Sequence, residues 1–176
     1  MTFTEPHDAT VLRRAFACFP SGVTAICAQV GGEAVGMAVS AFTPVSLDPP
    51  LISVCIQNTS RTWRKLRLAD RIGVSVFSDA HGGHARQLSR KEGDRFSGIP
   101  WQVTAEGAMF VEGAAAHFDC ALEREVEAGD HSIALLRIVG LESDPESTPL
   151  VFHASAFRQL AGELVDVRFR KVRRSA

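Results

Sequence analysis

The feature that most constrains the fold is a series of short runs rich in valine and isoleucine, separated by glycine, proline, aspartate or serine. The sequence shows no alternation of strands with long helices and no internal repeat, so a doubly wound parallel sheet fits poorly. The pattern predicts an antiparallel barrel whose ends are covered by short helices. The predicted strands lie at residues 23–30, 34–39, 51–56, 72–77, 114–122 and 132–141.

Three short helices accompany the predicted strands. An amphipathic helix follows Asp8, which has a side chain suited to an N-cap, and Pro-Ser-Gly ends it. Two further helices are expected at 62–68 and 84–89, the first preceded by Thr59 and Ser60 as candidate caps. The Gly-Gly pair at 31–32 favours a hairpin turn between the first two strands.

Length and composition indicate one domain. A chain of 176 residues buries a single core, and we assign residues 1–160 to this domain and 161–176 to a basic tail. Apolar residues make up 45% of the chain, and no apolar run is long enough to span a bilayer. The N-terminus lacks a basic region followed by a hydrophobic core, so we expect no signal peptide and a cytoplasmic location.

The charge balance argues against nucleic acid and membrane surfaces as partners, because the formal net charge is only −1. Five of the seven residues 168–174 are lysine or arginine. We interpret this tail as solvated or as a local contact with a partner.

The sequence does not predict a metal site or a disulfide framework. His81-x-x-His84 has no third ligand close by. The Gly-x-Gly-x-x-Gly, Gly-Lys-Ser/Thr, His-Glu-x-x-His and Gly-x-Ser-x-Gly motifs are absent. The four cysteines are far apart, without a Cys-x-x-Cys pair, and lie at positions 18, 27, 55 and 120.

The segment "GMAVSAFTPVSLDPPL", residues 36–51, joins two apolar runs without an obvious tight turn. Ser40, Thr43 and Ser46 supply hydroxyl groups, and small residues let another molecule approach the backbone. We therefore predict that a flat ligand lies along this segment. Taken alone, such a segment is also typical of an ordinary loop.

The segment "CIQNTSRTW", residues 55–63, places polar side chains where a strand is expected to end and a helix to begin. A helix N-terminus, hydroxyl groups and an arginine favour a phosphate, although Ser or Thr before a helix is more often a simple cap. Two other polar sites, His131 in "GDH" and Arg95 in "DRF", resemble ordinary surface residues on sequence alone.

Taken together and in order, these segments give the chain a specific resemblance. It is similar to the short-chain flavin reductases, the reductase components of two-component flavin-dependent monooxygenases, over about residues 11–160. The motifs that carry the resemblance are "FPSGVTAI", "GMAVSAFTPVSLDPPL", "TSRTW", "GVSVF", "DRFSGIPW", "GDHSI" and "PLVF".

The resemblance implies a mainly β fold, an antiparallel six-stranded split β-barrel of Greek-key type with a few short helices. It implies a homodimer with the flavin near the subunit interface. It further implies that NADH or NADPH reduces FMN or FAD by hydride transfer and that the reduced flavin passes to a separate monooxygenase. Without a Rossmann fingerprint, the nicotinamide is expected to stack on the flavin and on a few side chains.

The resemblance also implies residue roles. His131 is expected to act catalytically near the nicotinamide, with Phe152 or Phe157 close to the pocket. Ala38 and Ala41 depart from the Thr, Ser or Asn common in the family, and His81 stands where glutamine is common. The residues expected to bind the flavin are Ser40, Ala41, Phe42, Thr43, Ser46, Leu47, Cys55, Gln57, Asn58, Ser60, Arg61, Thr62, Arg95 and Phe96.

Two other interpretations remain open at this point. Split barrels also resemble pyridoxamine phosphate oxidases, although the Ser-Leu-Asp-Pro-Pro and Gly-Asp-His signatures point elsewhere. The second is a flavin- or haem-binding module without NAD(P)H turnover. The sequence leaves open the choice between FMN and FAD, the choice between NADH and NADPH, and the identity of the partner monooxygenase.

Overall fold

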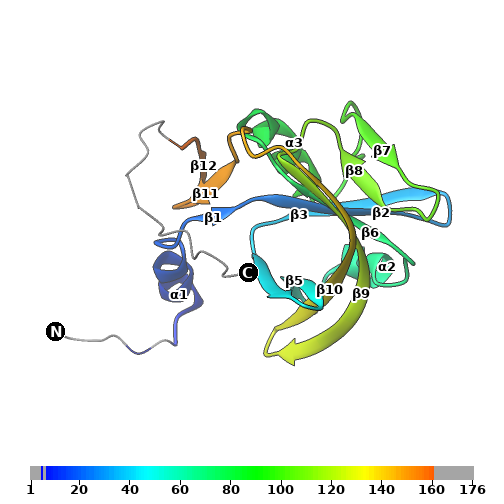
Figure 1. Cartoon of the computed structure of the whole chain (residues 1–176). Coiled ribbons are helices and arrows are strands. Elements are labelled where there is room, and N and C mark those ends of the chain that lie inside the picture. Colours follow the sequence, from blue (N-terminus) through cyan, green and yellow to red (C-terminus); the bar gives the residue numbers. More distant parts are fainter. Residues whose placement is uncertain (1–4, 6, 161–176) are drawn as a thin grey trace, which may run out of the picture.

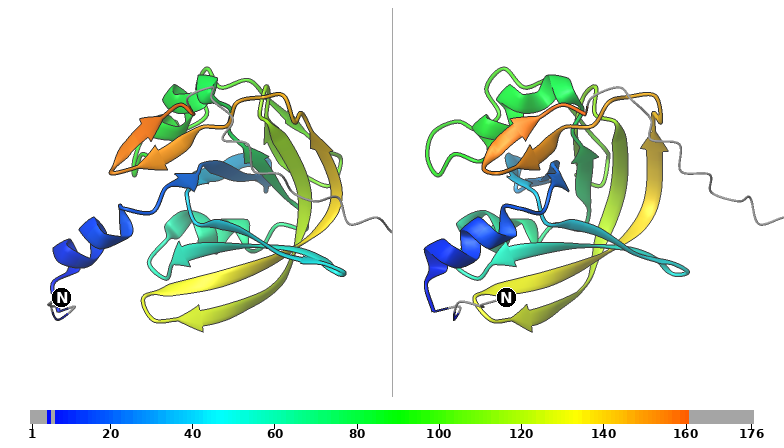
Figure 2. Two further views of the ribbon diagram at one scale, coloured as in Figure 1. Left: turned by 60° about the vertical axis from the view of Figure 1, so that its left-hand side comes forward. Right: turned by 90° about the vertical axis from the view of Figure 1, so that its left-hand side faces the viewer.

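The computed structural model describes residues 5 and 7–160, and a curled antiparallel sheet dominates it (Figure 1). The sheet has seven strands in the spatial order β3-β2-β6-β9-β10-β5-β4. Its long strands β9 and β10 bend around the core (Figure 2). The strands are β2 (Thr24–Val30), β3 (Glu33–Val39), β4 (Phe42–Leu47), β5 (Pro50–Gln57), β6 (Ile72–Val76), β9 (Ala116–Ala128) and β10 (His131–Ser143).

The mainly β prediction is confirmed, but the sheet differs from the expected barrel in two respects. It contains seven strands instead of six, and in the described residues its edge strands β3 and β4 pair only with β2 and β5. The extra strand is β4, which lies in the segment expected to avoid a tight turn. The sequence does not suggest this strand, because Pro44 has no backbone N–H to donate to a neighbouring strand. A proline is tolerated here because β4 is an edge strand with a register shift directly after Pro44. Leu47 pairs with Pro50, so a tight hairpin is present after all.

Two short sheets and four helical segments complete the fold. β1 (Ser21–Gly22), β11 (Val151–His153) and β12 (Ala156–Arg158) form one small sheet, and β7 (Trp101–Val103) and β8 (Met109–Val111) form the other. None of these five strands was predicted. The helical segments are α1 (Ala9–Phe16), α2 (Arg61–Leu66), a 3-10 turn at Asp79–His81 and α3 (Gly82–Leu88).

The predicted caps and the Gly-Gly turn are confirmed. Asp8 accepts a hydrogen bond from the Thr10 N–H at 2.7 Å, and Ser60 accepts one from the Trp63 N–H at 3.1 Å. Gly31 and Gly32 adopt φ angles of 60° and 84°, a left-handed conformation that glycine enters without strain. They join β2 and β3 as expected.

The core lies on both faces of β2. Ile26 and Ala28 belong to a cluster that α2 covers through Trp63 and Leu66. The alternate residues of β2 face a second cluster, which α3 covers through Ala85 and Leu88. Both helices also pack against the edge strand β3. The arrangement leaves the free edge of β3 between the start of α2 and the end of α3.

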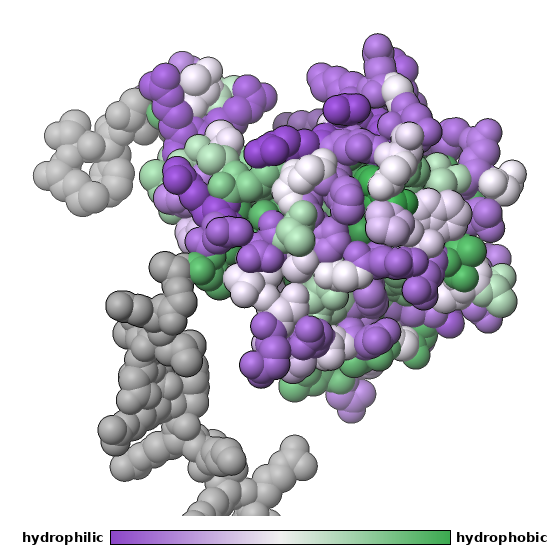
Figure 3. Space-filling model, turned by 90° about the horizontal axis from the view of Figure 1, so that it is seen from above, coloured by the Kyte–Doolittle hydropathy of each residue, from purple (hydrophilic) through white to green (hydrophobic). Residues whose placement is uncertain are grey.

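Polar side chains predominate on one face of the described residues (Figure 3). Hydrophilic side chains cover most of the face seen from above, with smaller hydrophobic areas between them (Figure 3). Helix α1 projects from the body of the protein (Figure 2), and none of its residues is buried. In the described part of the chain, no helix is long and apolar enough to cross a membrane. The predicted basic tail lies outside the described residues.

Candidate functional site

A cleft of about 480 Å³ lies beside the middle of β3, between the start of α2 and the end of α3. Five of the residues predicted from sequence line it or its rim: Gln57, Ser60, Arg61, Thr62 and Arg95. The structure adds residues that the sequence reasoning missed, namely Thr59, Ser89, Arg90, Lys91 and Glu92. We call this space the cationic cleft.

The charges of the cationic cleft favour an anion. Four positively charged side chains line it (Arg61, Arg90, Lys91 and Arg95) against one carboxylate, Glu92. Several positive side chains around one cleft attract an anion more strongly than a single surface lysine does, because their electrostatic potentials add.

Arg95 is held in place by three acceptors. Its Nη1 donates to Thr62 Oγ1 at 2.8 Å and to the Gly36 carbonyl at 3.3 Å, and its Nη2 donates to the Lys91 carbonyl at 3.3 Å. The loop that carries it is fixed by Asp94, which accepts hydrogen bonds from the N–H groups of Phe96 and Ser97. Arg95 therefore links the start of α2 to β3 with a preorganised guanidinium.

Two hydroxyl groups of the cleft retain a proton to donate. Ser60 Oγ accepts the cap hydrogen bond from Trp63, and its proton is directed at Met37 Sδ, a weak acceptor 3.7 Å away. Thr62 Oγ1 accepts from Arg95. Thr62 can therefore donate its own proton to an incoming phosphate oxygen without giving up Arg95, whereas Ser60 would give up only its weak contact with Met37.

The helix that carries these groups is itself anchored to the sheet. The Trp63 indole N–H donates to Glu125 Oε1 at 2.5 Å, and Arg67 pairs with the other oxygen of the same carboxylate at 2.6 Å. Glu125 lies on β9, so α2 cannot shift far without breaking a charge-assisted pair.

Two further hollows extend the cationic cleft along β3. One, of about 310 Å³, shares Arg61, Thr62 and Arg95 with it and is also lined by Phe96 and Lys65. The other, of about 110 Å³, shares Ala38 and contains Ser40, Phe152 and Phe157. The two phenylalanines meet edge to face, with ring centroids 5.6 Å apart.

The predicted segment around Ser40 opens into a larger apolar hollow of about 740 Å³. Ser40, Ala41, Phe42 and Thr43 line it together with Phe152 and with Phe16 of α1. Since Ser40 and Phe152 also line the small hollow, the hollows lie next to one another from the cationic groups to the apolar end, and we call this series the groove along β3. The structure thus brings together segments predicted separately from the sequence.

Besides Asn58, three residues predicted to bind the flavin line none of these hollows. Ser46 and Leu47 lie toward the tip of the β4–β5 hairpin, where Leu47 is 97% exposed. Cys55 is exposed on β5, and its backbone N–H donates to the Ala41 carbonyl at 3.3 Å. In a single chain, these three are neighbours of the groove through β4 and β5.

His131 begins β10, directly opposite Gln57 of β5. Its Nδ1 lies 2.7 Å from Asp130 Oδ1, and the hydrogen bond and charge of His131 lower the pKa of Asp130. An Asp130 carboxylate accepts the Nδ1–H, which leaves Nε2 available to another group. His131 therefore lies one strand away from the rim of the cationic cleft.

His81 serves the fold. It is buried against Phe77, its Nδ1 accepts from the Ser78 N–H at 3.2 Å, and its Nε2 lies 2.9 Å from the Glu112 carbonyl. Both ring nitrogens are therefore engaged by the protein. His84 lies beside it, and burial lowers the pKa of its imidazole.

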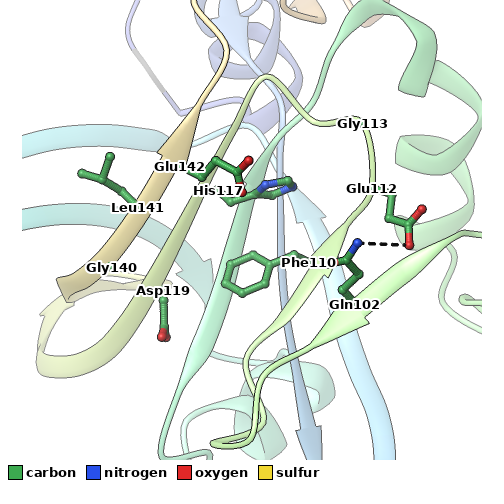
Figure 4. A pocket seen from close by; sticks show the side chains of 9 residues that line it. All are labelled: Gln102, Phe110, Glu112, Gly113, His117, Asp119, Gly140, Leu141 and Glu142. Atoms are coloured by element: carbon green, nitrogen blue, oxygen red, sulfur yellow. Dashed lines mark hydrogen bonds between the residues drawn. The ribbon is translucent and has the colours of Figure 1, made fainter.

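A second hollow of similar size, about 520 Å³, lies between β8 and the outer side of β9 and β10 (Figure 4). Three carboxylates line it, Glu112, Asp119 and Glu142, together with Phe110 and His117. No lysine or arginine is among its lining residues. Burial raises the pKa of Asp119, although Arg71 opposes this. We call this space the acidic hollow.

Comparison with known proteins finds a family match over most of the chain. Residues 16–161 match the family described as flavin reductase like domain. The structure is similar to that of the NADH:FAD oxidoreductase SgcE6 of Streptomyces globisporus, solved with NAD and FAD fragments, with a TM-score of 0.86, 33% identity and coverage of 93% of this chain and 99% of the other.

Two curated relatives extend the comparison. The reductase subunit HsaB of a flavin-dependent monooxygenase from Rhodococcus jostii is 31% identical over 153 residues, which cover 87% of this chain and 78% of the relative. A probable flavin reductase from Rhizobium meliloti is 34% identical over 140 residues, or 79% of this chain. The match spans 45% of that relative's length.

Proposed function

This chain belongs to the flavin reductase-like family, and we propose that it is an NAD(P)H:flavin oxidoreductase that binds FMN or FAD in the groove along β3. The observation that carries this proposal is that the cationic cleft lies next to the hollow lined by Ser40 and Phe152, with which it shares Ala38 and Ser89. One end of the groove suits a phosphate and the other suits a flat ring.

The phosphate of the flavin would occupy the cationic cleft. Arg61 and Arg95 neutralise its charge, and the hydroxyl groups of Ser60 and Thr62 donate their remaining protons. Lys91 and Arg90 add charge from the opposite wall. This assignment depends on side chains from several elements and not on the dipole of the short helix α2.

The ring system would lie along residues 40–43 toward Phe152. Ala38 and Ala41 offer no side-chain hydrogen bonds, so the backbone and Ser40 and Thr43 must orient the ring. A bound flavin supplies the redox chemistry by accepting a hydride from the reduced nicotinamide. The protein would hold the two rings in the orientation that the transfer needs.

His131 would contact the nicotinamide. With Nδ1 held by Asp130, its Nε2 is the atom available to the cosubstrate. Phe152 and Phe157 provide an apolar wall at the ring end of the groove. The nicotinamide nucleotide is then held by stacking and a few side chains.

We also propose that two copies associate. Phe16 and Phe19 are 70% and 78% exposed, and Leu47 at the β4–β5 hairpin is 97% exposed. Large apolar groups this exposed are typical of an interface. A second copy over α1 and this hairpin would cover the apolar end of the groove. Light scattering after size exclusion should give twice the chain mass of 19.0 kDa.

The reduced flavin would serve a separate monooxygenase component, in keeping with the similarity to HsaB, the reductase subunit of a flavin-dependent monooxygenase from Rhodococcus jostii. The basic tail remains a candidate contact for such a partner. A non-catalytic flavin- or haem-binding module is the main competing function. The pyridoxamine phosphate oxidase interpretation loses support because the family match is to flavin reductases.

Anaerobic stopped-flow absorbance tests the proposal. The protein is mixed with FMN or FAD and then with NADH or NADPH, and the oxidised-flavin band is followed. We expect rapid bleaching with at least one pair, which also identifies the preferred flavin and nucleotide. Flavin binding without bleaching by either nucleotide would establish the binding module in place of the enzyme.

A further inference from the structure

The side chain of Asn58 is engaged by the turn between β9 and β10. Its Nδ2 donates to the Gly129 carbonyl at 3.1 Å, and its Oδ1 accepts from Ser132 Oγ at 2.8 Å. The Asn58 backbone N–H donates to the Asp130 carbonyl at 3.0 Å. One residue at the end of β5 therefore makes three hydrogen bonds to one tight turn.

These hydrogen bonds bracket His131. Their partners are the two residues before it and the residue after it along the chain. Gly129 adopts φ 68°, so the turn has a left-handed backbone that the carboxamide of Asn58 fixes from outside. Asn58 thereby sets the point and direction at which His131 leaves the turn.

The sheet register shows why this matters for the site. His131 is paired with Gln57, and residues directly opposite in an antiparallel pair project from the same face. Gln57 lines the cationic cleft. A shift of the turn would therefore move His131 relative to the groove while leaving Arg61, Thr62 and Arg95 in place.

We propose that Asn58 is a positioning residue for His131 and does not serve as a flavin ligand. This inference rests on the proposed function, and it revises the sequence-based expectation that Asn58 binds the flavin. Asn58 acts on the nicotinamide step through the turn, whereas Ser60, Arg61 and Thr62 act on the flavin phosphate.

The test compares Asn58→Ala with Ser132→Ala, which removes one of the same hydrogen bonds from the far side of the turn. We expect Asn58→Ala to raise the KM for NADH about tenfold and Ser132→Ala about threefold, as the loss of two bonds and one bond implies. The dissociation constant of FMN should remain within about twofold of wild type.

A double-variant cycle separates positioning from a general structural role. If Asn58 acts through His131, Asn58→Ala should add little in a His131→Ala background. Thr104→Val is the matched control, because Thr104 Oγ1 accepts the Ala108 N–H at 3.2 Å in the distant β7–β8 hairpin. This variant should leave both the KM for NADH and the affinity for FMN unchanged.

Two binding and kinetic results would overturn the inference, and one hydrogen-exchange result would do the same. Weaker FMN binding in Asn58→Ala with a silent Ser132→Ala would make Asn58 a direct flavin ligand. Full additivity with His131→Ala would make its role unrelated to that histidine.

Hydrogen exchange of the amides at 129–132 gives a readout without turnover. If the hydrogen bonds of Asn58 hold the turn, exchange should be faster in Asn58→Ala, and unchanged exchange contradicts the inference. Absence of flavin reduction by the wild-type protein would instead contradict the proposed function, and the exchange result would still decide whether Asn58 holds the turn.

Discussion

The cationic cleft and the acidic hollow are similar in size, about 480 and 520 Å³, but opposite in charge. Four positively charged side chains line the first, and three carboxylates line the second. Volume alone would not distinguish them. The sign of the lining charge and the availability of hydroxyl protons make the cleft, and not the hollow, suited to a phosphate.

The two regions also differ in how their polar groups are held. In the cleft, Arg95 is fixed by Thr62, Gly36 and Lys91, so the cation is ready before a ligand arrives. In the acidic hollow, Asp119 has an oxygen that is inaccessible to solvent and without a hydrogen-bond partner in the structure. An anion entering that hollow would add repulsion to an unfavourable burial.

Arg95→Ala should cause the largest change and would test this contrast directly. Loss of its charge-assisted contact should weaken FMN binding about 50-fold, whereas riboflavin, which lacks the phosphate, should bind as before. Fluorescence titration with both flavins measures the ratio. Glu142→Gln in the acidic hollow is the control and should leave both affinities unchanged. Equal losses for FMN and riboflavin in Arg95→Ala would indicate a damaged fold instead of a lost phosphate contact.

Ser60 allows a sharper test, since it combines a cap with a proposed phosphate contact. Ser60→Asp keeps a capping side chain but places a negative charge beside the phosphate, so FMN binding should fall about tenfold with little change in the free energy of unfolding. Ser60→Ala should lose about 1 kcal/mol of stability through the cap. Urea unfolding and FMN titration of both variants separate the two effects. Normal FMN affinity in Ser60→Asp would remove Ser60 from the site.

The smallest expected effect is a difference in thiol labelling between a cysteine near the cationic cleft and a cysteine near the acidic hollow. Cys55, two residues before Gln57, is exposed, whereas Cys120, beside Asp119, is buried. Burial raises the pKa of the Cys120 thiol to about 12. At pH 8 a thiol with such a pKa is almost wholly protonated, so Cys120 should resist a thiol reagent that labels Cys55. Mass spectrometry of the labelled protein checks this, and early labelling of Cys120 would show that the sheet opens there.

Local chemistry made much of the fold predictable. The cap at Asp8 and the turn at Gly31-Gly32 follow from properties of single residues and are present as expected. The strand β4 was missed because Pro44, Pro49 and Pro50 have no backbone N–H, so the sequence does not suggest a strand paired with β5 here. The five short strands β1, β7, β8, β11 and β12 have too few residues to show a periodic pattern.

The site was predictable in parts. Residues near 40 and 57–62 were found because their hydroxyl groups and arginine share one short segment each. Arg90 and Lys91 were missed because they reach the cleft from the end of α3, a tertiary arrangement that no local pattern encodes. Asn58 was predicted as a flavin contact, and local sequence gave no sign of its hydrogen bonds, which run to residues 129, 130 and 132, all more than seventy positions away. Its assignment to the flavin remains an untested prediction that the proposed positioning role now replaces.

The most direct measurement of the central claim is the affinity of the wild-type protein for FMN and for riboflavin at low salt. If the cationic cleft holds the flavin phosphate, FMN should bind at least about tenfold more tightly, because riboflavin lacks the group that the arginines and hydroxyls contact. The advantage should shrink as salt is raised. Equal affinities at every salt concentration would contradict the placement of the flavin in this cleft.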